Sequence, residues 1–492
     1  MSIVKNNKKE IIIFIIILLI ELVIFLPWIK GHYATDTYKI IDIGYKEAAR
    51  GSLRDGRIFM YFIGNIANLL DISVEGYVRV LLILALIVST LSVLLIRKII
   101  LEYVKENNIA DVIITTLLSF VTIFNFMYLE NLYYAEAFVM SISVFLNIYV
   151  AKLLVDESKR CKIKALVLEI IAIFMYQGTA GTFIAMYGLF ILMKYPNNYK
   201  TVMKKFLKDI VIFIVAILIN VFFVKFFEYK FNIHQRRMGN AFSIFYNIYF
   251  IFRFIGYVLR YTCGLFKRDL LLEIVAIISI ITVATSYKTE NRTYVLNYMI
   301  IFGITILSAF STNILSLSCL NAGRIKFSMG ALVGILFIYI FCKIKEFNNK
   351  GIWKGLLTII LCIYSIINIL NYSIIINEHI EVNKLEKETV KDLGKQITKY
   401  EEENSCKINY IKKIIMPGDA HYEQIKTKST ITADAVHCSW AAVEVINYYL
   451  NKNYIGEYIS NKQYEEILKK NNIKRNNVIL FKDTLFIEIY DY

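Results

Sequence analysis

A short polar segment, residues 31–57, gathers the side chains that could do chemistry in this 492-residue chain. Its carboxylates are Asp36, Asp42, Glu47 and Asp55, and its arginines are Arg50, Arg54 and Arg57. A carboxylate can take the proton of a hydroxyl nucleophile, and an arginine can hold a phosphate through two parallel hydrogen bonds. The segment therefore contains groups suited to group transfer onto an alcohol. A solvated, salt-bridged loop is the other interpretation of the same residues.

Three further polar segments interrupt apolar runs later in the chain. The first contains Glu130 and Glu136 among aromatic residues, the second is the pair Tyr176-Gln177, and the third contains Arg324. Each also has an ordinary interpretation. Glutamates and tyrosines mark membrane interfaces, a glutamine can bond backbone groups at a helix break, and basic residues anchor the ends of spans.

The composition predicts that a membrane protein positions these segments. Hydrophobic residues make up 57% of the chain, charged residues make up 20%, and the mean hydropathy is +0.53. The apolar residues come in runs of roughly 18 to 22, the length that crosses about 30 Å of hydrocarbon as a helix. The net charge is +16, but the basic residues lie in short loops between these runs. That is the positive-inside pattern and does not indicate nucleic-acid binding.

The apolar runs predict a polytopic α-helical protein with about eleven spans. The predicted spans are 11–28, 77–97, 111–128, 137–155, 165–178, 180–194, 209–227, 269–286, 293–311, 327–342 and 354–376. Lys5, Lys8 and Lys9 precede the first span, so the N-terminus is expected in the cytoplasm. This count places all four polar segments on the outer side.

Residues 242–266 are the ambiguous stretch in this topology. They are long enough to cross, but Arg253 and Arg260 lie within them, and an arginine at bilayer depth is costly. An interfacial helix is the expected structure. A crossing would instead turn the basic loop at 343–354 outward, against the charge rule.

Two domains are predicted. A membrane domain covers 1–376, with an outer loop at 29–76, and a small extracytoplasmic α/β domain covers 377–492. In the second domain the composition becomes charged with mixed signs, and a helical pattern covers 379–403. Apolar clusters follow at 411–415, 441–450 and 478–489.

The order of these motifs resembles the type-II Gtr glucosyltransferase family of bacterial membrane proteins. The first outer segment has the form HYxxDxYxxxxxG…GR, carried by His32, Tyr33, Asp36, Tyr38, Gly44, Gly56 and Arg57. The other matching features are a glutamate-containing loop before the fourth span, the Tyr-Gln pair, a late outer arginine and Ser439-Trp440. The resemblance covers the whole chain and rests on the order of these short motifs.

This resemblance implies a GT-C-like fold and an enzyme of the bacterial plasma membrane. Such an enzyme transfers a hexose, typically glucose, from undecaprenyl phosphate to a cell-surface glycan at the outer face, with inversion. The implied catalytic residues are Asp36 as base, with Glu130 and Glu136 as second carboxylates. The implied substrate contacts are Arg57 and Arg324 to the donor phosphate, with Tyr33, Tyr176 and Gln177. The donor is a lipid-linked sugar, and no cofactor or metal site is predicted.

Alternatives stay open from the residues alone. Asp42 or Asp55 could replace Asp36 as the base. A glycolipid flippase or exporter would place charges inside spans along a path, whereas most charges here lie at span ends. A polysaccharide polymerase would have a large outer loop, whereas the extra outer mass here is C-terminal. The sequence has no Gly-rich phosphate loop, which favours a lipid-linked donor over a nucleotide sugar.

Overall fold

The structure, a computed structural model, is described for part of the chain. The described residues are 2–106, 108–156, 158–196, 198–232, 239, 241–254, 256–257, 262, 264–265, 292–311, 313–316, 322–344, 350–404, 410–417, 427, 429, 431, 434–436, 438, 441–474, 476 and 478–487. They form two compact units. The membrane unit comprises Met1–Leu26, Ala49–Ile66 and Val80–Ser373, and the α/β unit comprises Pro27–Ala48, Ala67–Arg79 and Ile374–Tyr492.

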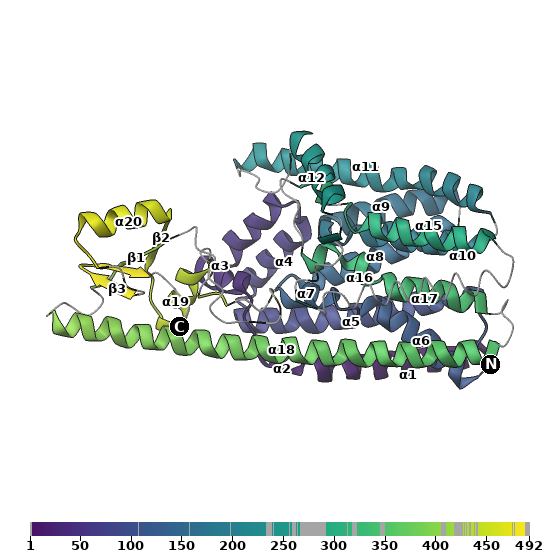
Figure 1. The fold of residues 1–492 in the computed structure, drawn as a ribbon, viewed down its shortest axis with the longest axis horizontal. Coiled ribbons are helices and arrows are strands. Elements are labelled where there is room, and N and C mark those ends of the chain that lie inside the picture. Colours follow the sequence, from purple (N-terminus) through teal and green to yellow (C-terminus); the bar gives the residue numbers. More distant parts are fainter. Residues whose placement is uncertain are drawn as a thin grey trace. The chain divides into compact units, whose positions relative to one another are not determined.

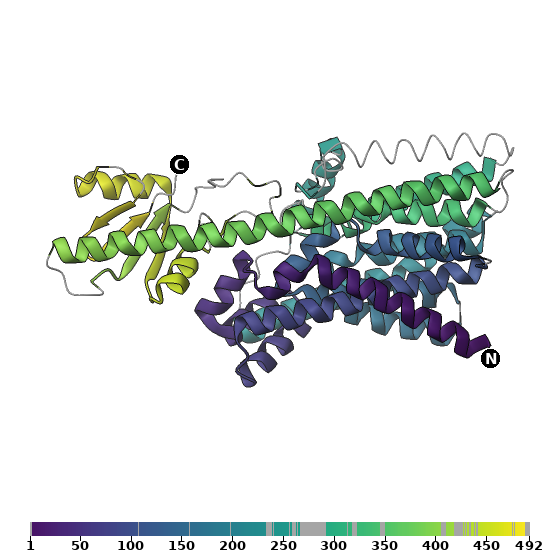
Figure 2. The same cartoon turned by 90° about the horizontal axis from the view of Figure 1, so that it is seen from below.

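The membrane unit is a bundle of helices (Figure 1, Figure 2). Its helices, some of which extend into segments of the other unit, are α1 (Ser2–Ile24), α4 (Ile58–Leu69), α5 (Val74–Tyr103), α6 (Ile109–Ile123), α7 (Tyr128–Tyr133), α8 (Ala137–Val155), α9 (Lys159–Met175), η1 (Gln177–Thr179), α10 (Gly181–Lys194), α11 (Tyr199–Phe231), α12 (Ala241–Arg253), α15 (Arg292–Ser308), η2 (Asn313–Leu315), η3 (Gly323–Ile325), α16 (Phe327–Gly330) and α17 (Leu332–Lys343). Helix α8 packs along α9 and α10, α10 along α15, α11 along α9, and α17 along α6.

Several of these apolar helices could cross a membrane, but the prediction of about eleven spans is wrong. Among the described residues, four helices are long and apolar enough, or five if the helices on either side of Phe25 count as one broken span. The four are Val74–Tyr103, Ala137–Val155, Tyr199–Phe231 and Gly351–Glu403. The span expected at 269–286 lies outside the described residues.

Polar side chains explain why some predicted spans are shorter helices. The span expected at 111–128 is helical only to Ile123, because the Asn125 side chain bonds the neighbouring backbone. Asn125 Nδ2 donates to the carbonyl oxygen of Thr122 at 3.0 Å, and its Oδ1 accepts from the N–H of Met127 at 3.1 Å. Such local bonds compete with the helical i→i−4 pattern.

A second break separates the spans expected at 165–178 and 180–194. Tyr176 ends α9 with an extended backbone, φ −160° and ψ 112°, and η1 follows before α10 begins. The resulting helices have 17 and 14 residues, fewer than the roughly 20 needed to cross the hydrocarbon core. The sequence predicted this break and the short apolar segments on either side of it.

Helix α12 covers the first half of the ambiguous stretch at 242–266. It has 13 residues, about 20 Å of helix, which is shorter than the hydrocarbon core. Phe242, Phe245 and Phe252 are exposed on it. Arg260 lies outside the described residues, and the interfacial helix stays a prediction.

The predicted small C-terminal α/β part is confirmed. It contains a four-stranded sheet in the order β2-β1-β4-β3, with parallel β1–β2 and β1–β4 pairs and an antiparallel β3–β4 pair. Its elements are β1 (Lys413–Pro417), α19 (Ala442–Leu450), β2 (Ile455–Ile459), α20 (Asn461–Lys470), β3 (Val478–Phe481) and β4 (Thr484–Ile487). The helix expected at 379–403 is the second part of α18 (Lys350–Glu403).

Alternating side chains of the central strands fill two cores, one on each face of the sheet. Ile414 and Leu485 belong to a core built with residues of α18 and α19. Ile415 and Phe486, one position further along each strand, pack with Tyr464 and other residues of α20. Figure 1 shows α20 lying along the sheet.

The first polar segment, residues 31–57, is largely helical. It begins directly after α2 (Leu26–Lys30) and forms α3 (Thr35–Arg54), which is broken at Gly44 by a backbone with a positive φ of 77°. Only a residue without a Cβ adopts this conformation readily. Tyr38 of α3 is buried in the core of the α/β unit, so the first half of the segment belongs to that unit.

Candidate functional site

Two arginine–glutamate pairs lie in the membrane unit, and all four residues are ones that the sequence predicted. Arg57 Nη1 lies 2.5 Å from Glu136 Oε2, and Arg324 Nη1 lies 2.6 Å from Glu130 Oε1. The backbone N–H of Arg324 also donates to Glu130 Oε2 at 2.9 Å. Charged hydrogen bonds of this kind are stronger than neutral ones. The glutamates therefore hold both guanidinium groups in place.

Each arginine also lies over a tyrosine ring. The guanidinium carbon of Arg57 is 4.7 Å from the ring centroid of Tyr176, and that of Arg324 is 4.5 Å from the ring centroid of Tyr134. The negative face of an aromatic ring attracts a cation at this distance. Carboxylate and ring together fix the orientation of each guanidinium plane.

The two pairs form one electrostatic cluster around Tyr176, which interacts with all four charged side chains. Burial favours a lower pKa for Arg57, but the carboxylate of Glu136 raises this pKa above its ordinary value, while Arg324 acts in the opposite direction. Arg57 is therefore charged at any physiological pH. We call Arg57, Glu130, Glu136, Tyr176 and Arg324 the arginine cluster.

A glycine turn presents Arg57 to the cluster. Gly56 has φ +75°, and a Cβ there would lie 2.7 Å from Val224 Cγ2 and 2.8 Å from Gln177 Nε2. Gln177 Nε2 donates to the carbonyl oxygen of Asp55 at 2.9 Å, and Asn220 Nδ2 donates to that of Gly56 at 3.1 Å. Gln177 thus holds the turn before Arg57.

Arg324 is also preceded by a tightly packed glycine. A Cβ at Gly323 would lie 2.8 Å from Glu130 Oε2 and 2.6 Å from Leu265 Cδ1. Only a glycine lets the η3 turn come this close to the carboxylate that binds Arg324. Both arginines of the cluster therefore follow a glycine that permits close backbone approach.

Two polar groups in this region have no partner among the described residues. The buried Nε–H of Arg57 has no acceptor, and neither polar atom of the buried Asn131 side chain, next to Glu130 on α7, has a partner. Buried donors are normally bonded, so an unpaired one is suited to an acceptor brought by a ligand. Guanidinium donors prefer carboxylate or phosphate oxygens.

The remaining predicted site residues, Tyr33 and Asp36, lie in the α/β unit. Tyr33 donates its N–H to Asn383 Oδ1 at 2.9 Å and its hydroxyl to Glu75 Oε1 at 2.8 Å. Asp36 is in the first turn of α3, with an exposed side chain.

The two alternative bases are also found in contacts of their own. Asp42 lies in the α/β unit, where Oδ1 accepts from Asn447 Nδ2 at 3.4 Å. Asp55 lies in the membrane unit, with Oδ1 4.0 Å from Arg54 Nε. Ser439-Trp440 lies outside the described residues.

Sequence reasoning missed Tyr134, Asn131 and Asn220. Tyr134 stands in an aromatic segment whose members look alike in the sequence, so its contact with Arg324 was not evident. Asn220 did have a signal, because an amide inside an apolar run needs a partner there. No group of three or more histidine, cysteine, aspartate or glutamate side chains in the described part of the chain could hold a metal ion.

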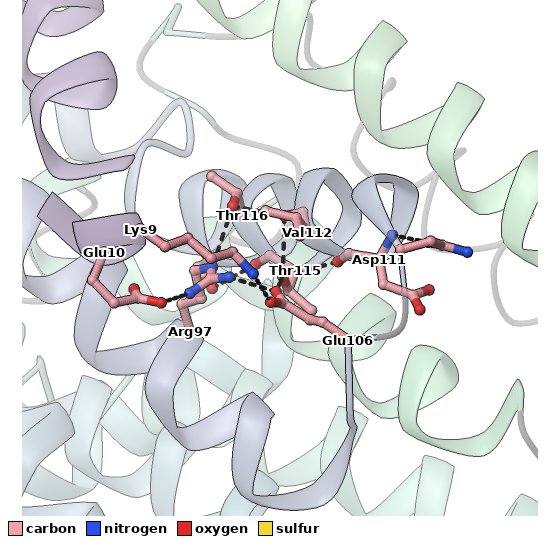
Figure 3. A network of polar contacts seen from close by, with 10 residues as sticks. Lys9, Glu10, Arg97, Glu106, Asp111, Val112, Thr115 and Thr116 are labelled. Atoms are coloured by element: carbon pink, nitrogen blue, oxygen red, sulfur yellow. Dashed lines mark hydrogen bonds and ion pairs between the residues drawn. The ribbon is translucent and has the colours of Figure 1, made fainter. Parts of the chain in front are cut away.

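A second charged cluster in the same unit offers a contrast (Figure 3). Arg97 of α5, whose side chain is 0% exposed, pairs with Glu10 of α1 and with Glu106, the latter at 2.5 Å. Lys9 also pairs with Glu106, and Thr115 donates to it at 2.6 Å. We call Lys9, Glu10, Arg97 and Glu106 the closed network, because its two positive and two negative charges cancel.

The fold and the arginine cluster define a helical protein with several apolar helices that could cross a membrane and a small α/β unit. Comparison of the chain with protein-family models, curated proteins and solved structures gives no match.

Proposed function

We propose that this chain is a membrane glycosyltransferase that moves a hexose from a polyprenyl-phosphate donor to a cell-surface glycan. One observation carries the proposal. Two guanidinium groups share one cluster, and Arg57 there has a buried Nε–H without an acceptor among the described residues. A phosphate oxygen would satisfy this donor, and the second arginine would add attraction for the negative charge.

The arginines would act on the leaving group. As the acceptor oxygen bonds to the anomeric carbon, the bond from that carbon to the phosphate oxygen breaks, and the phosphate keeps the electron pair. The polyprenyl phosphate then carries one more negative charge than in the donor. Fixed cations at this place would stabilise the transition state more than the ground state.

A carboxylate must take the proton of the acceptor hydroxyl. Asp36 is the proposed base, since it is exposed, whereas Glu130 and Glu136 are each bonded to an arginine. In each pair the glutamate already uses carboxylate oxygens to accept hydrogen bonds from a guanidinium group. We assign Glu130 and Glu136 the role of holding the arginines. Catalysis at the outer face, a GT-C-like fold and glucose as the sugar are part of the same proposal.

Binding of a labelled polyprenyl-phosphate hexose to the full-length protein in lipid nanodiscs tests the phosphate site. Arg57→Ala and Arg324→Ala are expected to weaken binding. The matched control is Arg253→Ala, because Arg253 also lies over a tyrosine, 5.5 Å from the Tyr249 ring centroid, but is exposed on α12. Equal affinity in all three variants and the wild type would refute the proposed phosphate site.

Transfer of the labelled hexose to envelope glycan tests the base. Asp36→Asn is expected to bind the donor normally and to lose transfer, since an amide cannot accept the proton. Full transfer by this variant would remove Asp36 from the mechanism. Movement of the donor lipid across vesicles without any sugar transfer would instead support a flippase.

A further inference from the structure

Helix α9 contains a buried glutamate that the proposed reaction does not use. Glu169 is 0% exposed, and neither of its carboxyl oxygens has a hydrogen-bond partner among the described residues. An ionised carboxylate without a cation or donors is strongly disfavoured inside a protein, and more so within a membrane. Each charge of the closed network, by contrast, has an opposite charge beside it.

The neighbouring helix supplies an acceptor that lacks a donor. Asn147 of α8 is fully buried, its Nδ2 donates to the carbonyl oxygen of Ser143 at 2.7 Å, and its Oδ1 has no partner among the described residues. An amide oxygen and a carboxylate cannot bond each other directly, because both are acceptors. A proton on the carboxyl group would supply the missing donor.

The packing of α8 on α9 places Asn147 and Glu169 at a similar level along the two helix axes. Ser143 Oγ donates to the carbonyl oxygens of Ala172 and Tyr176, at 2.9 and 3.1 Å. The two helices form a hairpin, so one turn forward on α8 corresponds to one turn back on α9. Asn147, one turn after Ser143, therefore lies near the level of Glu169.

Buried or half-buried charged groups on two elements packed against α9 form pairs of their own. From α11, the buried Asp209 bonds Lys162 Nζ at 2.5 Å and the hydroxyl of Tyr187 at 2.6 Å. From α8, Lys152 pairs with Glu102 at 2.5 Å and with Asp156.

Tyr149 and the η1 helix, which also lie near α9, provide no counter-ion for Glu169. Tyr149 of α8 accepts from Lys164 Nζ at 3.1 Å. The η1 helix contains no titratable residue. No described cation is thus assigned to Glu169.

We infer that Glu169 is a proton-binding site, whose carboxylic acid donates a hydrogen bond to Asn147 Oδ1. The ligand is a proton and not a metal ion, because one carboxyl and one amide oxygen are too few ligands for a hard cation. The bond joins α8 to α9 about two turns from Tyr176, so occupancy by the proton stabilises the packing that places Tyr176 against Arg57. This inference does not depend on glycosyl transfer.

Infrared spectroscopy of the full-length protein in nanodiscs tests the inference. The wild type is expected to show the carbonyl stretch of a buried protonated carboxylic acid at neutral pH. Glu169→Gln should lose this band, and Asn147→Leu should shift it to higher frequency by removing the hydrogen-bond acceptor. Either variant assigns the band, so the test survives if one of them does not fold.

Two results would overturn the inference. One is a wild-type spectrum in which these variants change only ionised carboxylate bands. The other is loss of the protonated band when the choline salt of the buffer is replaced by a sodium salt, because that would identify a sodium-binding site. Glu21→Gln is the control, because Glu21 is equally buried but accepts a bond from Thr90 at 3.0 Å. In the Glu21→Gln background, Asn147→Leu should still shift the Glu169 band as it does in the wild type.

Discussion

The arginine cluster and the closed network are built from the same residue types in the same unit, yet their bonding differs. Arg97 bonds two carboxylates and also donates from Nε to Thr116 Oγ1 at 3.3 Å. Arg57 bonds one carboxylate, and its buried Nε–H has no acceptor among the described residues. Every guanidinium nitrogen of Arg97 thus has a bond inside the protein, whereas Arg57 keeps a donor that a ligand could use.

This difference separates a structural role from a binding role. Removing one partner of a complete buried ion pair leaves an uncompensated charge, so the closed network should matter mainly for stability. An arginine that keeps an unpaired donor should matter mainly for ligand affinity. The two clusters therefore predict opposite patterns when stability and donor binding are both measured.

The largest expected effect is on stability, at Arg97. Arg97→Met leaves Glu10 and Glu106 without their shared cation and should lower the free energy of unfolding by about 3–5 kcal/mol. Arg57→Met should cost clearly less. Unfolding of each variant by sodium dodecyl sulfate from a mild detergent gives both values. Equal losses would mean that the two clusters are equally structural.

A buried glutamate of the α/β unit lies between these two cases, since it has hydrogen-bond donors but no cation among the described residues. Glu386, on α18 beyond its apolar segment, accepts from Tyr38 at 2.8 Å, from Asn383 at 3.0 Å and from the N–H of Ala435. Burial, with a smaller contribution from Asp434, raises the pKa of Glu386 from 4.5 to about 7, against the lowering effect of these three hydrogen bonds.

The raised pKa of Glu386 predicts that this unit loses stability as pH rises. The folded state binds the proton more tightly than the unfolded state, so the stabilisation is complete below pH 4.5 and is lost as pH passes through about 7. The full loss is about 3 kcal/mol. Pulse proteolysis of the full chain in urea at several pH values measures it. Glu386→Gln should flatten the profile, and a profile equal to the wild type would contradict the assignment.

The tight glycines of the arginine cluster predict a smaller effect. Gly323→Ala places a Cβ 2.8 Å from Glu130 Oε2 and should cost about 1–3 kcal/mol of stability while disturbing Arg324. Gly51→Ala is the matched control, since nothing lies within 4 Å of its added Cβ and alanine favours the helix. Thermal unfolding and donor binding compare the two. A harmless Gly323→Ala would show that the η3 turn can move away from Glu130.

The sequence predicted the members of the arginine cluster because charge is conspicuous in an apolar chain. It could not predict their pairing, since Arg324 and Glu130 are 194 positions apart and a polar segment does not reveal which partner it contacts. The Gly-Arg pattern was visible at Gly56, but the close packing that requires this glycine depends on Asn220 and Val224 of α11.

Fold prediction succeeded where periodicity is strong and local. In the C-terminal part, β1, α19, β3 and β4 lie at the predicted apolar clusters 411–415, 441–450 and 478–489, whereas β2 and α20 fall outside them. Helix lengths in the membrane unit were less predictable, because a single side chain such as Asn125 can end a helix within an apolar run. Hydropathy averages over a window and does not register that bond.

The smallest expected effect separates the two clusters most sharply. Arg57→Lys keeps the charge but removes the planar fork, and lysine binds phosphate as a point charge. Loss of one charged hydrogen bond, about 1.4 kcal/mol, should weaken donor binding roughly tenfold with little change in stability. Arg97→Lys should do the reverse, because a lysine cannot bond Glu10, Glu106 and Thr116 together. Donor binding and unfolding measured on both variants test these opposite effects. If Arg57→Lys lowered stability without changing donor affinity, Arg57 would be a structural residue like Arg97.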